Sequence, residues 1–244
     1  MSTHALTINN LTVSYGSKPV LWNINAVIPQ GVLLAVAGPN GAGKSTLIKS
    51  IVQLVTPQAG TITVLGGSYP QHRHQVAYIP QRSAVDWDFP INALDVVLMG
   101  RYGHIGWFKR PSEDDKFRAL EALHSVGMSS FAQHPIDELS CGQQQRIFLA
   151  RALVQDASVY LMDEPFVGVD SATEKIIIGL LKKLRDEGKT IVIVHHDLQT
   201  LQDYFDWLLL LNIERIACGP LDHAFKQEYL TTAYSSHQFS EKVL

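Results

Sequence analysis

Apolar stretches recur along this chain at the length and spacing of β-strands, and amphipathic helical patterns lie between many of them. The predicted strands are residues 6–13, 32–37, 60–65, 76–80, 158–162, 190–194 and 207–213. Strand, helix and strand follow one another in this order over much of the chain. We therefore expect an α/β protein with a mostly parallel sheet that is covered by helices.

One helix is predicted with both of its ends. Ser171 followed by Glu174 has the spacing of a capping box, which marks a helix start. The helical pattern then reaches about Asp186, and Gly188 follows as a stop signal.

The strand signal fades between about residues 88 and 155. Helices are predicted there over residues 92–99, 113–126 and 142–153. This pattern indicates a helical lobe inserted into a sheet-containing core. Since no internal repeat or low-complexity segment is visible, two lobes of one domain are favoured over two linked domains.

Composition excludes several classes of protein. The chain has 244 residues, 46% of them hydrophobic, and 20 Lys and Arg against 23 Asp and Glu, so its net charge of −3 gives no general reason to bind nucleic acid. Its apolar runs are far shorter than the roughly 18 to 20 residues that cross a bilayer. Cys141 and Cys218 suggest no disulfide framework, and the first residues lack a secretory signal. We expect a globular protein of a reducing cytoplasm.

The residues directly after the run 32–37 fit the phosphate-binding pattern G-x-x-x-x-G-K-[ST]. They are Gly38, Pro39, Asn40, Gly41, Ala42, Gly43, Lys44 and Ser45, followed by Thr46 in a helical pattern. Glycines let backbone N–H groups turn toward phosphate oxygens, and the following helix adds the positive end of its dipole. Lys44 is expected to reach the β- and γ-phosphates, and Ser45 to hold Mg²⁺.

Two acids follow the predicted strand 158–162. Asp163 and Glu164 would therefore stand at the carboxyl edge of the sheet, beside the phosphate loop. Asp163 is suited to the magnesium shell, and Glu164 to polarising an attacking water as a general base. Without the phosphate loop, the same acids would be read as a solvated strand end.

Ser140, Cys141, Gly142 and Gln143 begin another helical pattern, where backbone N–H groups and a hydroxyl are available for an anion. Alone, this could be only a helix cap. At this point the chain resembles the nucleotide-binding subunit of ATP-binding-cassette (ABC) transporters, whose motif here reads Leu-Ser-Gly-Gly-Gln. The resemblance covers about residues 6–218 and implies a P-loop NTPase fold of the ABC type. It implies a mostly parallel core, an N-terminal antiparallel β part and an inserted helical lobe.

Four further positions match the family pattern in the right order. Tyr15 resembles the aromatic residue that stacks on adenine. Gln81 resembles the glutamine between the lobes, which implies a role in catalysis and in binding Mg²⁺. Asp170 resembles the aspartate of the loop that crosses the dimer. His196 resembles the switch histidine near the γ-phosphate.

Cys141 departs from the family pattern because it stands at the first glycine of the Gly-Gly pair. Backbone N–H groups remain, so contact with phosphate survives if the local dihedral angles suit a residue with a Cβ. A tolerated substitution is favoured over the alternative, an oxidation-sensitive thiol at a helix N-terminus.

The resemblance also implies how such a chain works. Two cassettes pack head to tail, ATP with Mg²⁺ binds the loop of one, and the signature residues of the other close over it. Membrane permease subunits and a separate metal-binding protein are the implied partners, and the cytoplasmic face of the membrane is the implied location. We expect one domain, with a core lobe of about residues 1–87 and 156–218, a helical lobe of about 88–155, and a tail, 219–244, without an assigned role.

Aromatic residues are dense in residues 85–90 and 99–108. Both stretches resemble cassettes that serve manganese, zinc or iron importers, most of all the manganese and iron branch. In the family this region receives a short helix of the membrane subunit. Trp87, Phe89, Trp107 and Phe108 could equally fill the core of the helical lobe, while His72, His74 and His195 are read as loop or strand-end residues rather than metal ligands.

Two other functions compete with an importer ATPase. One is an ABC-type ATPase that acts as an assembly switch, although the long coiled coils and paired cassettes of some such proteins are absent from the sequence. The other is a nucleotide-binding module that has lost turnover through Cys141. The presence of Glu164, Gln81 and His196 argues against it.

Overall fold

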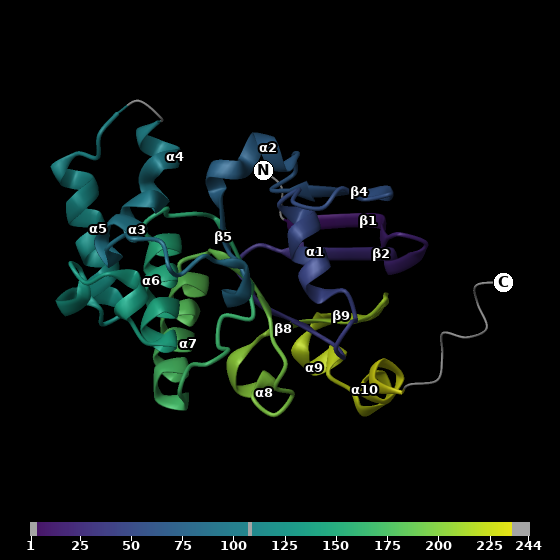
Figure 1. Ribbon diagram of the computed structural model, residues 1–244. Helices are drawn as coiled ribbons and strands as arrows, with labels where there is room; N and C mark the ends of the chain where they lie inside the picture. Colours follow the sequence, from purple (N-terminus) through teal and green to yellow (C-terminus); the bar gives the residue numbers. More distant parts are fainter. Residues whose placement is uncertain (1–3, 107–108, 236–244) are drawn as a thin grey trace. The chain divides into compact units, whose positions relative to one another are not determined.

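The computed structural model describes residues 4–106 and 109–235, and the aromatic pair Trp107 and Phe108 lies outside them. The chain divides into two compact units (Figure 1). Unit 1 contains residues 1–71 and 192–244, and unit 2 contains residues 72–191. The predicted lobe boundaries at residues 88 and 155 stay a prediction.

Unit 1 contains an antiparallel sheet in the order β2-β1-β4, formed by β1 (His4–Tyr15), β2 (Lys18–Pro29) and β4 (Ala59–Val64). Alternate positions of β1, such as Leu6 and Ile8, are buried, which is the pattern of a sheet with one covered face. Helix α1 (Lys44–Ile51) contacts β2 and β4. The predicted N-terminal antiparallel part is therefore present.

The rest of unit 1 contains three strands of a second sheet. β3 (Leu33–Ala37) pairs in parallel with β8 (Trp207–Asn212), and β9 (Glu214–Pro220) pairs antiparallel with β8. Every residue of β3 is buried, as expected of a parallel strand with both faces covered. The short helices near this sheet are α8 (Leu201–Tyr204), α9 (Leu221–Ala224) and α10 (Gln227–Tyr234).

The tail, to which the sequence analysis assigns no role, is folded through residue 235 and contains two helices. Helices α9 and α10 contact β8 and β9, and the Asn212 Nδ2 atom donates to the Ala233 carbonyl at 2.8 Å. The hydrogen bond and these contacts fix α10 to the sheet of unit 1.

Unit 2 contains β5 (Val76–Ile79) and β6 (Val159–Asp163), which pair in parallel. β7 (Thr190–Val194) begins in unit 2 and ends in unit 1. The strands follow the order β5-β6-β7-β3-β8-β9, with β9 antiparallel at the edge. The predicted mostly parallel sheet is confirmed.

Helices make up most of unit 2. The helices α3 (Ala93–Leu98), α5 (Glu113–Ser125) and α6 (Cys141–Leu153) contact one another, and they confirm the three helices predicted between residues 88 and 155. Their shared core is apolar, with Val97, Leu123 and Ile147 fully buried. Short helices are α2 (Tyr69–His72), which crosses the unit boundary, and α4 (Tyr102–Ile105).

Helix α7 (Ser171–Asp186) has the predicted extent, but its predicted cap is wrong. The N-cap is Asp170, whose carboxylate accepts from the backbone N–H groups of Ala172 at 3.1 Å and Thr173 at 2.9 Å. Ser171 is already helical. Aspartate and serine cap equally well, so the one-residue shift is a local choice that the Ser171/Glu174 spacing could not resolve.

Candidate functional site

The phosphate-loop residues lie in unit 1, between β3 and α1. Gly38 and Gly43 have φ angles of 147° and 91°, which favour glycine. A Cβ on Gly38 would overlap the carbonyl of Leu211, and one on Gly43 would lie 2.6 Å from the Val20 carbonyl. Glycine is thus required at both ends of the loop, because strand and hairpin backbone press against it.

Lys44 is nearly buried within this loop. Its Nζ atom donates to the carbonyls of Gly38 and Pro39, at 2.9 Å in each case. Both acceptors are neutral carbonyls, so an anionic phosphate would be the stronger partner for this ammonium group. The loop therefore fits phosphate through its glycine cradle and its lysine.

The acidic strand end lies in unit 2. All five residues of β6 are buried, and Asp163 at its end is 0% exposed. The pKa of Tyr78 is raised to about 12 by burial and by the negative charge of Asp163. A carboxylate at the end of a buried strand is a ligand type that Mg²⁺ accepts.

Glu164 follows with a left-handed backbone, at φ 55°, which is rare for a non-glycine residue. Gln81 donates from its Nε2 atom to the Glu164 Oε2 atom at 2.8 Å. Two of the predicted catalytic residues of unit 2 are thus in direct contact. Strained backbone conformations cluster at functional sites, because the surrounding structure must hold them.

Ser140 caps α6 with the geometry of a capping box. Its backbone N–H donates to the Gln143 Oε1 atom at 2.8 Å, and the Gln143 N–H donates back to the serine hydroxyl at 3.4 Å. Cys141 is the first helical residue and is exposed, and it is not among the residues with positive φ. A Cβ therefore fits the backbone conformation at this departure from the family pattern.

The other predicted residues take varied positions. Asp170 caps α7. Its carboxylate accepts hydrogen bonds from the backbone N–H groups of Ala172 and Thr173 and, at 2.7 Å, from the Thr173 hydroxyl, and these bonds lower the pKa of Asp170. Tyr15 ends β1 with 57% of its surface exposed, which leaves its ring free for stacking. His196 is exposed and is the second residue after β7.

His195, its neighbour, has the opposite environment. It is 5% exposed, its Nε2 atom lies 2.8 Å from the Thr200 hydroxyl, and its ring packs on Phe205 at 5.1 Å. Burial lowers the pKa of His195 to about 4, so the ring is neutral at pH 7.

Sequence reasoning missed Arg82, the residue after Gln81. Its guanidinium donates to the Gln144 Oε1 atom of α6 at 3.0 Å and stacks over Trp87 at 5.4 Å. Trp87 in turn contacts Phe148 at 4.8 Å, whereas Phe89 is 55% exposed. Trp87 therefore packs on α6, whereas Phe89 faces solvent. No local pattern signals a contact that joins residues 62 positions apart.

The chain belongs to the ABC transporter family, whose sequence model matches residues 21–167. Curated relatives are similar over nearly the whole chain. The zinc transport system ATP-binding protein TroB of Treponema pallidum (strain Nichols) is 55% identical, over 96% of this chain and 88% of the relative. The manganese transport system ATP-binding protein MntB of Bacillus subtilis (strain 168) is 54% identical, over 93% of this chain and 91% of the relative.

Solved structures agree on the fold. A metal-chelate type ABC transporter in an inward-facing conformation is similar with a TM-score of 0.84 and 30% identity, over 96% of this chain and 90% of that one. The ATP-binding cassette MJ0796, in a dimeric post-hydrolysis state bound to ADP and Pi, is similar with a TM-score of 0.79 and 30% identity. That match covers 88% of this chain and 98% of the cassette. The fold is therefore that of an ABC ATPase cassette. Within residues 4–106 and 109–235, no helix has the length and apolarity to span a bilayer.

Proposed function

We propose that this protein hydrolyses ATP and thereby drives a divalent metal ion, manganese or zinc, through a separate membrane permease. The observation that carries the proposal is the pair of relatives at 54% and 55% identity over more than nine-tenths of the chain, which are named as manganese and zinc transport ATP-binding proteins. The glycine-cradled Lys44 and the strained Glu164 support the chemical step.

The residues have distinct roles in that step. Lys44 and the backbone N–H groups of the loop bind the β- and γ-phosphates, and Ser45 with Asp163 would hold Mg²⁺. The metal ion, when bound, neutralises charge that develops on the phosphates. Glu164 orients and polarises the attacking water, and Gln81 fixes the carboxylate through the 2.8 Å hydrogen bond.

The protein works as a dimer in this proposal. Ser140, Gly142 and Gln143 of one copy donate to the γ-phosphate bound by the other, while Asp170 stands in the loop that meets the partner and His196 contacts the γ-phosphate. The γ-phosphate collects donors from both copies, so its loss favours opening. The permease would convert this cycle into transport at the cytoplasmic face of the membrane, with a separate metal-binding protein delivering the ion.

Metal uptake by the reconstituted complex tests the proposal. The permease that co-purifies with this chain is placed in vesicles with the chain and Mg·ATP, and uptake of radioactive Mn²⁺ and Zn²⁺ is measured. ATP-dependent uptake of either ion, abolished in Glu164→Gln, is expected. ATP hydrolysis with no uptake of any divalent metal would favour the assembly-switch alternative instead.

A further inference from the structure

A cavity of about 550 Å³ lies in unit 2, and none of the residues that line it has a proposed catalytic role. Arg73 and His74 come from the turn before β5, and Tyr102 and Gly103 come from α4. Lys109 and Arg110 come from the segment between α4 and α5. Three separate segments of the chain therefore converge on one hollow.

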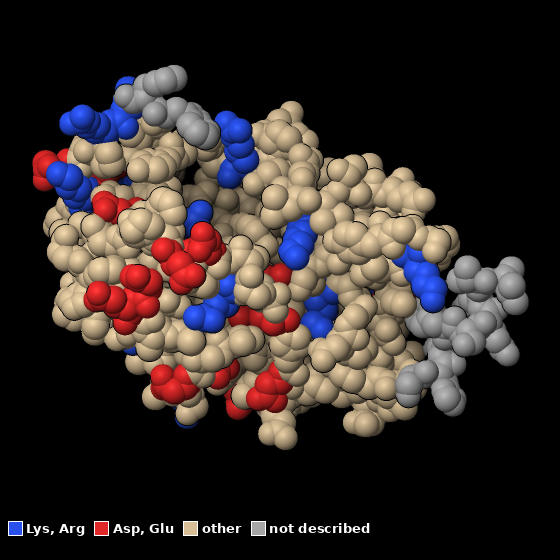
Figure 2. Space-filling view, in the orientation of Figure 1, with Lys and Arg blue, Asp and Glu red and all other residues tan. Residues whose placement is uncertain are grey.

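The charge of this cavity is one-sided. Its lining includes the cations Arg73, Lys109 and Arg110 and no carboxylate. In the part of the chain that the structure describes, none of these three forms an ion pair, and Arg73 Nε reaches only the His74 Nε2 atom at 3.4 Å. Figure 2 shows blue groups at the upper left, where Figure 1 places α4 and the start of α5, with red acidic groups beside them.

Three other cations of the same unit are paired with carboxylates. Arg101, Lys116 and Arg118 each contact a carboxylate of α5, at 3.0, 2.7 and 2.7 Å respectively. The contrast matters because the chain as a whole is acidic, with a net charge of −3. Within residues 4–106 and 109–235, the three cations of the cavity have no such carboxylate partner, so their positive charge stays uncompensated there.

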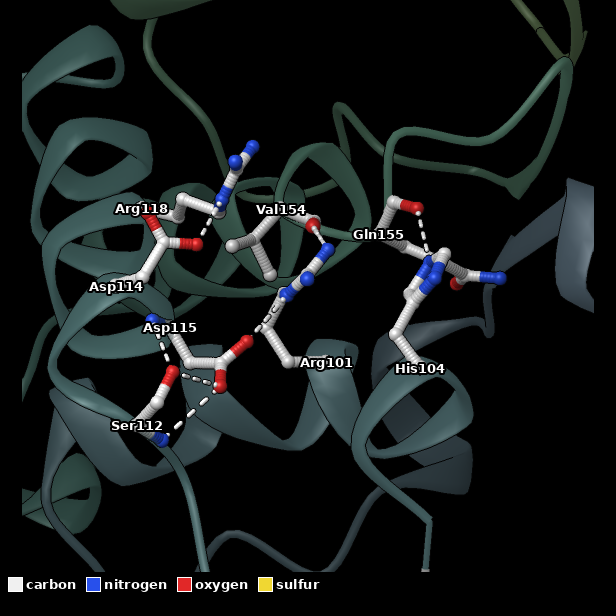
Figure 3. A network of polar contacts seen from close by, with 8 residues as sticks. All are labelled: Arg101, His104, Ser112, Asp114, Asp115, Arg118, Val154 and Gln155. Carbon is white, nitrogen blue, oxygen red and sulfur yellow. Dashed lines mark hydrogen bonds and ion pairs between the residues drawn. The ribbon is translucent and has the colours of Figure 1, made fainter.

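The wall formed by α4 is held in place on its inner side (Figure 3). Arg101, just before α4, donates to Asp115 at 3.0 Å and to the Val154 carbonyl at 3.4 Å, and the His104 Nε2 atom lies 3.0 Å from the Gln155 carbonyl. A Cβ on Gly103 would lie 3.0 Å from the His74 Nδ1 atom, so the two walls nearly touch. A wall that is already fixed in place loses little entropy when a ligand binds.

We propose that this cavity binds the phosphate of an anionic phospholipid headgroup. Guanidinium groups match phosphate oxygens in two-point hydrogen bonds, and basic pockets are a known form of headgroup site. The two charged oxygens of a phosphodiester can accept from two of these cations, and the hydroxyl groups of a glycerol headgroup can accept from the third. Tyr102, 51% exposed at the cavity, has the amphipathic character of residues at a membrane interface.

The inference rests on the proposed function only in placing the chain at a membrane. The site would attach the cassette directly to the lipid surface, in addition to any contact with the permease. Each basic residue near an anionic membrane contributes on the order of 1 kcal/mol, so neutralising three weakens binding about 100-fold.

Vesicle co-sedimentation of the full chain, without permease, tests the site. Vesicles of phosphatidylglycerol mixed with phosphatidylcholine are compared with vesicles of phosphatidylcholine alone. We expect binding to the first only, weakened about 100-fold in Arg73→Gln/Lys109→Gln/Arg110→Gln. The matched control, Lys116→Gln/Arg118→Gln/Lys175→Gln, removes the same charge elsewhere and should retain most of the affinity.

Further measurements distinguish a lipid phosphate from free phosphate and from an acidic protein segment. Glycerol phosphate at millimolar concentration should compete with the vesicles, whereas inorganic phosphate that competes equally well would mean a free-phosphate site and overturn the headgroup assignment. Equal losses in both triple variants would show diffuse attraction and no site. Absent vesicle binding, with loss of permease co-purification in the first variant, would assign the cavity to an acidic protein segment.

The ATPase rate keeps this test separate from the proposed function. The triple variant should hydrolyse ATP as fast as wild type because no residue of the proposed catalytic set is changed. Vesicle binding by a chain that hydrolyses no ATP would leave the headgroup site standing and overturn the proposed function alone.

Discussion

At the scale of single residues, the proposed chemistry depends on groups held in costly arrangements. Glu164 keeps a left-handed backbone and a carboxylate bound to Gln81, and Lys44 is nearly buried with its ammonium group hydrogen-bonded to the carbonyls of Gly38 and Pro39. Such arrangements persist when the surrounding structure over-determines them, and they prepare the site for its ligand. Both residues are therefore informative to substitute.

Lys44→Ala should weaken ATP binding about 10- to 100-fold, because it removes charge-assisted hydrogen bonds to phosphate. Titration with a fluorescent ATP analogue measures the affinity. Lys49→Ala, on the same helix but at its other end, is the matched control and should bind as wild type does. An unchanged affinity in Lys44→Ala would contradict the phosphate-loop assignment.

His195 gives a prediction on the pH dependence of stability. Its pKa is about 4 in the folded chain and about 6.5 when unfolded, so the unfolded chain binds the extra proton first as the pH falls. The contribution of His195 to stability is present above pH 6.5 and is lost between pH 6.5 and 4, by up to about 3 kcal/mol. In urea unfolding across this window, His195→Gln should show a flatter dependence than wild type. If the free energy of unfolding of His195→Gln fell as steeply with decreasing pH as that of wild type, burial of a neutral His195 would not explain the pH dependence.

The phosphate loop and the acids Asp163 and Glu164 could be proposed from sequence because each motif is contiguous and its chemistry follows from spacing. Four isolated positions were assigned only through the resemblance to the family: Tyr15, Gln81, Asp170 and His196. Cys141 illustrates the limit, since only the structure shows a helical backbone that accepts its Cβ. Arg82 illustrates another, because its contact with Gln144 joins two segments that no local pattern links.

At the scale of elements, the periodicity of apolar residues predicted the buried strands and the long helices well. It did so because strands such as β3 and β6 are buried along their whole length and stand out as apolar runs. The edge strand β9 escaped prediction. Its residues alternate in exposure and include the polar Glu214 and Arg215, so its identity depends on pairing with β8.

The start of α5 gives a prediction at this scale. Asp115 completes a capping box with Ser112 and binds Arg101, and these bonds lower its pKa to about 2. Asp115→Asn should reduce the free energy of unfolding by about 1 to 2 kcal/mol, measured by urea unfolding at pH 7. Its neighbour Asp114 forms only an exposed pair with Arg118, so Asp114→Asn should cost less than about 0.5 kcal/mol. Equal effects would show that the Arg101 network contributes nothing.

At the scale of the whole molecule, the chain shares the ABC cassette fold with its family, whereas the cationic cavity beside α4 depends on the individual residues Arg73, Lys109 and Arg110. The sequence carried no signal for that cavity, because Arg73 and Arg110 are far apart along the chain. The identity of the transported metal is likewise absent from the catalytic motifs.

Sedimentation velocity of the Glu164→Gln variant tests the central claim most directly. This variant removes the proposed general base and keeps every phosphate donor, so Mg·ATP should convert it from monomer to a stable dimer. ADP should leave it monomeric, and the double variant with Lys44→Ala should stay monomeric with either nucleotide. A Glu164→Gln protein that remains a monomer at saturating Mg·ATP, or that hydrolyses ATP at the wild-type rate, would contradict the account.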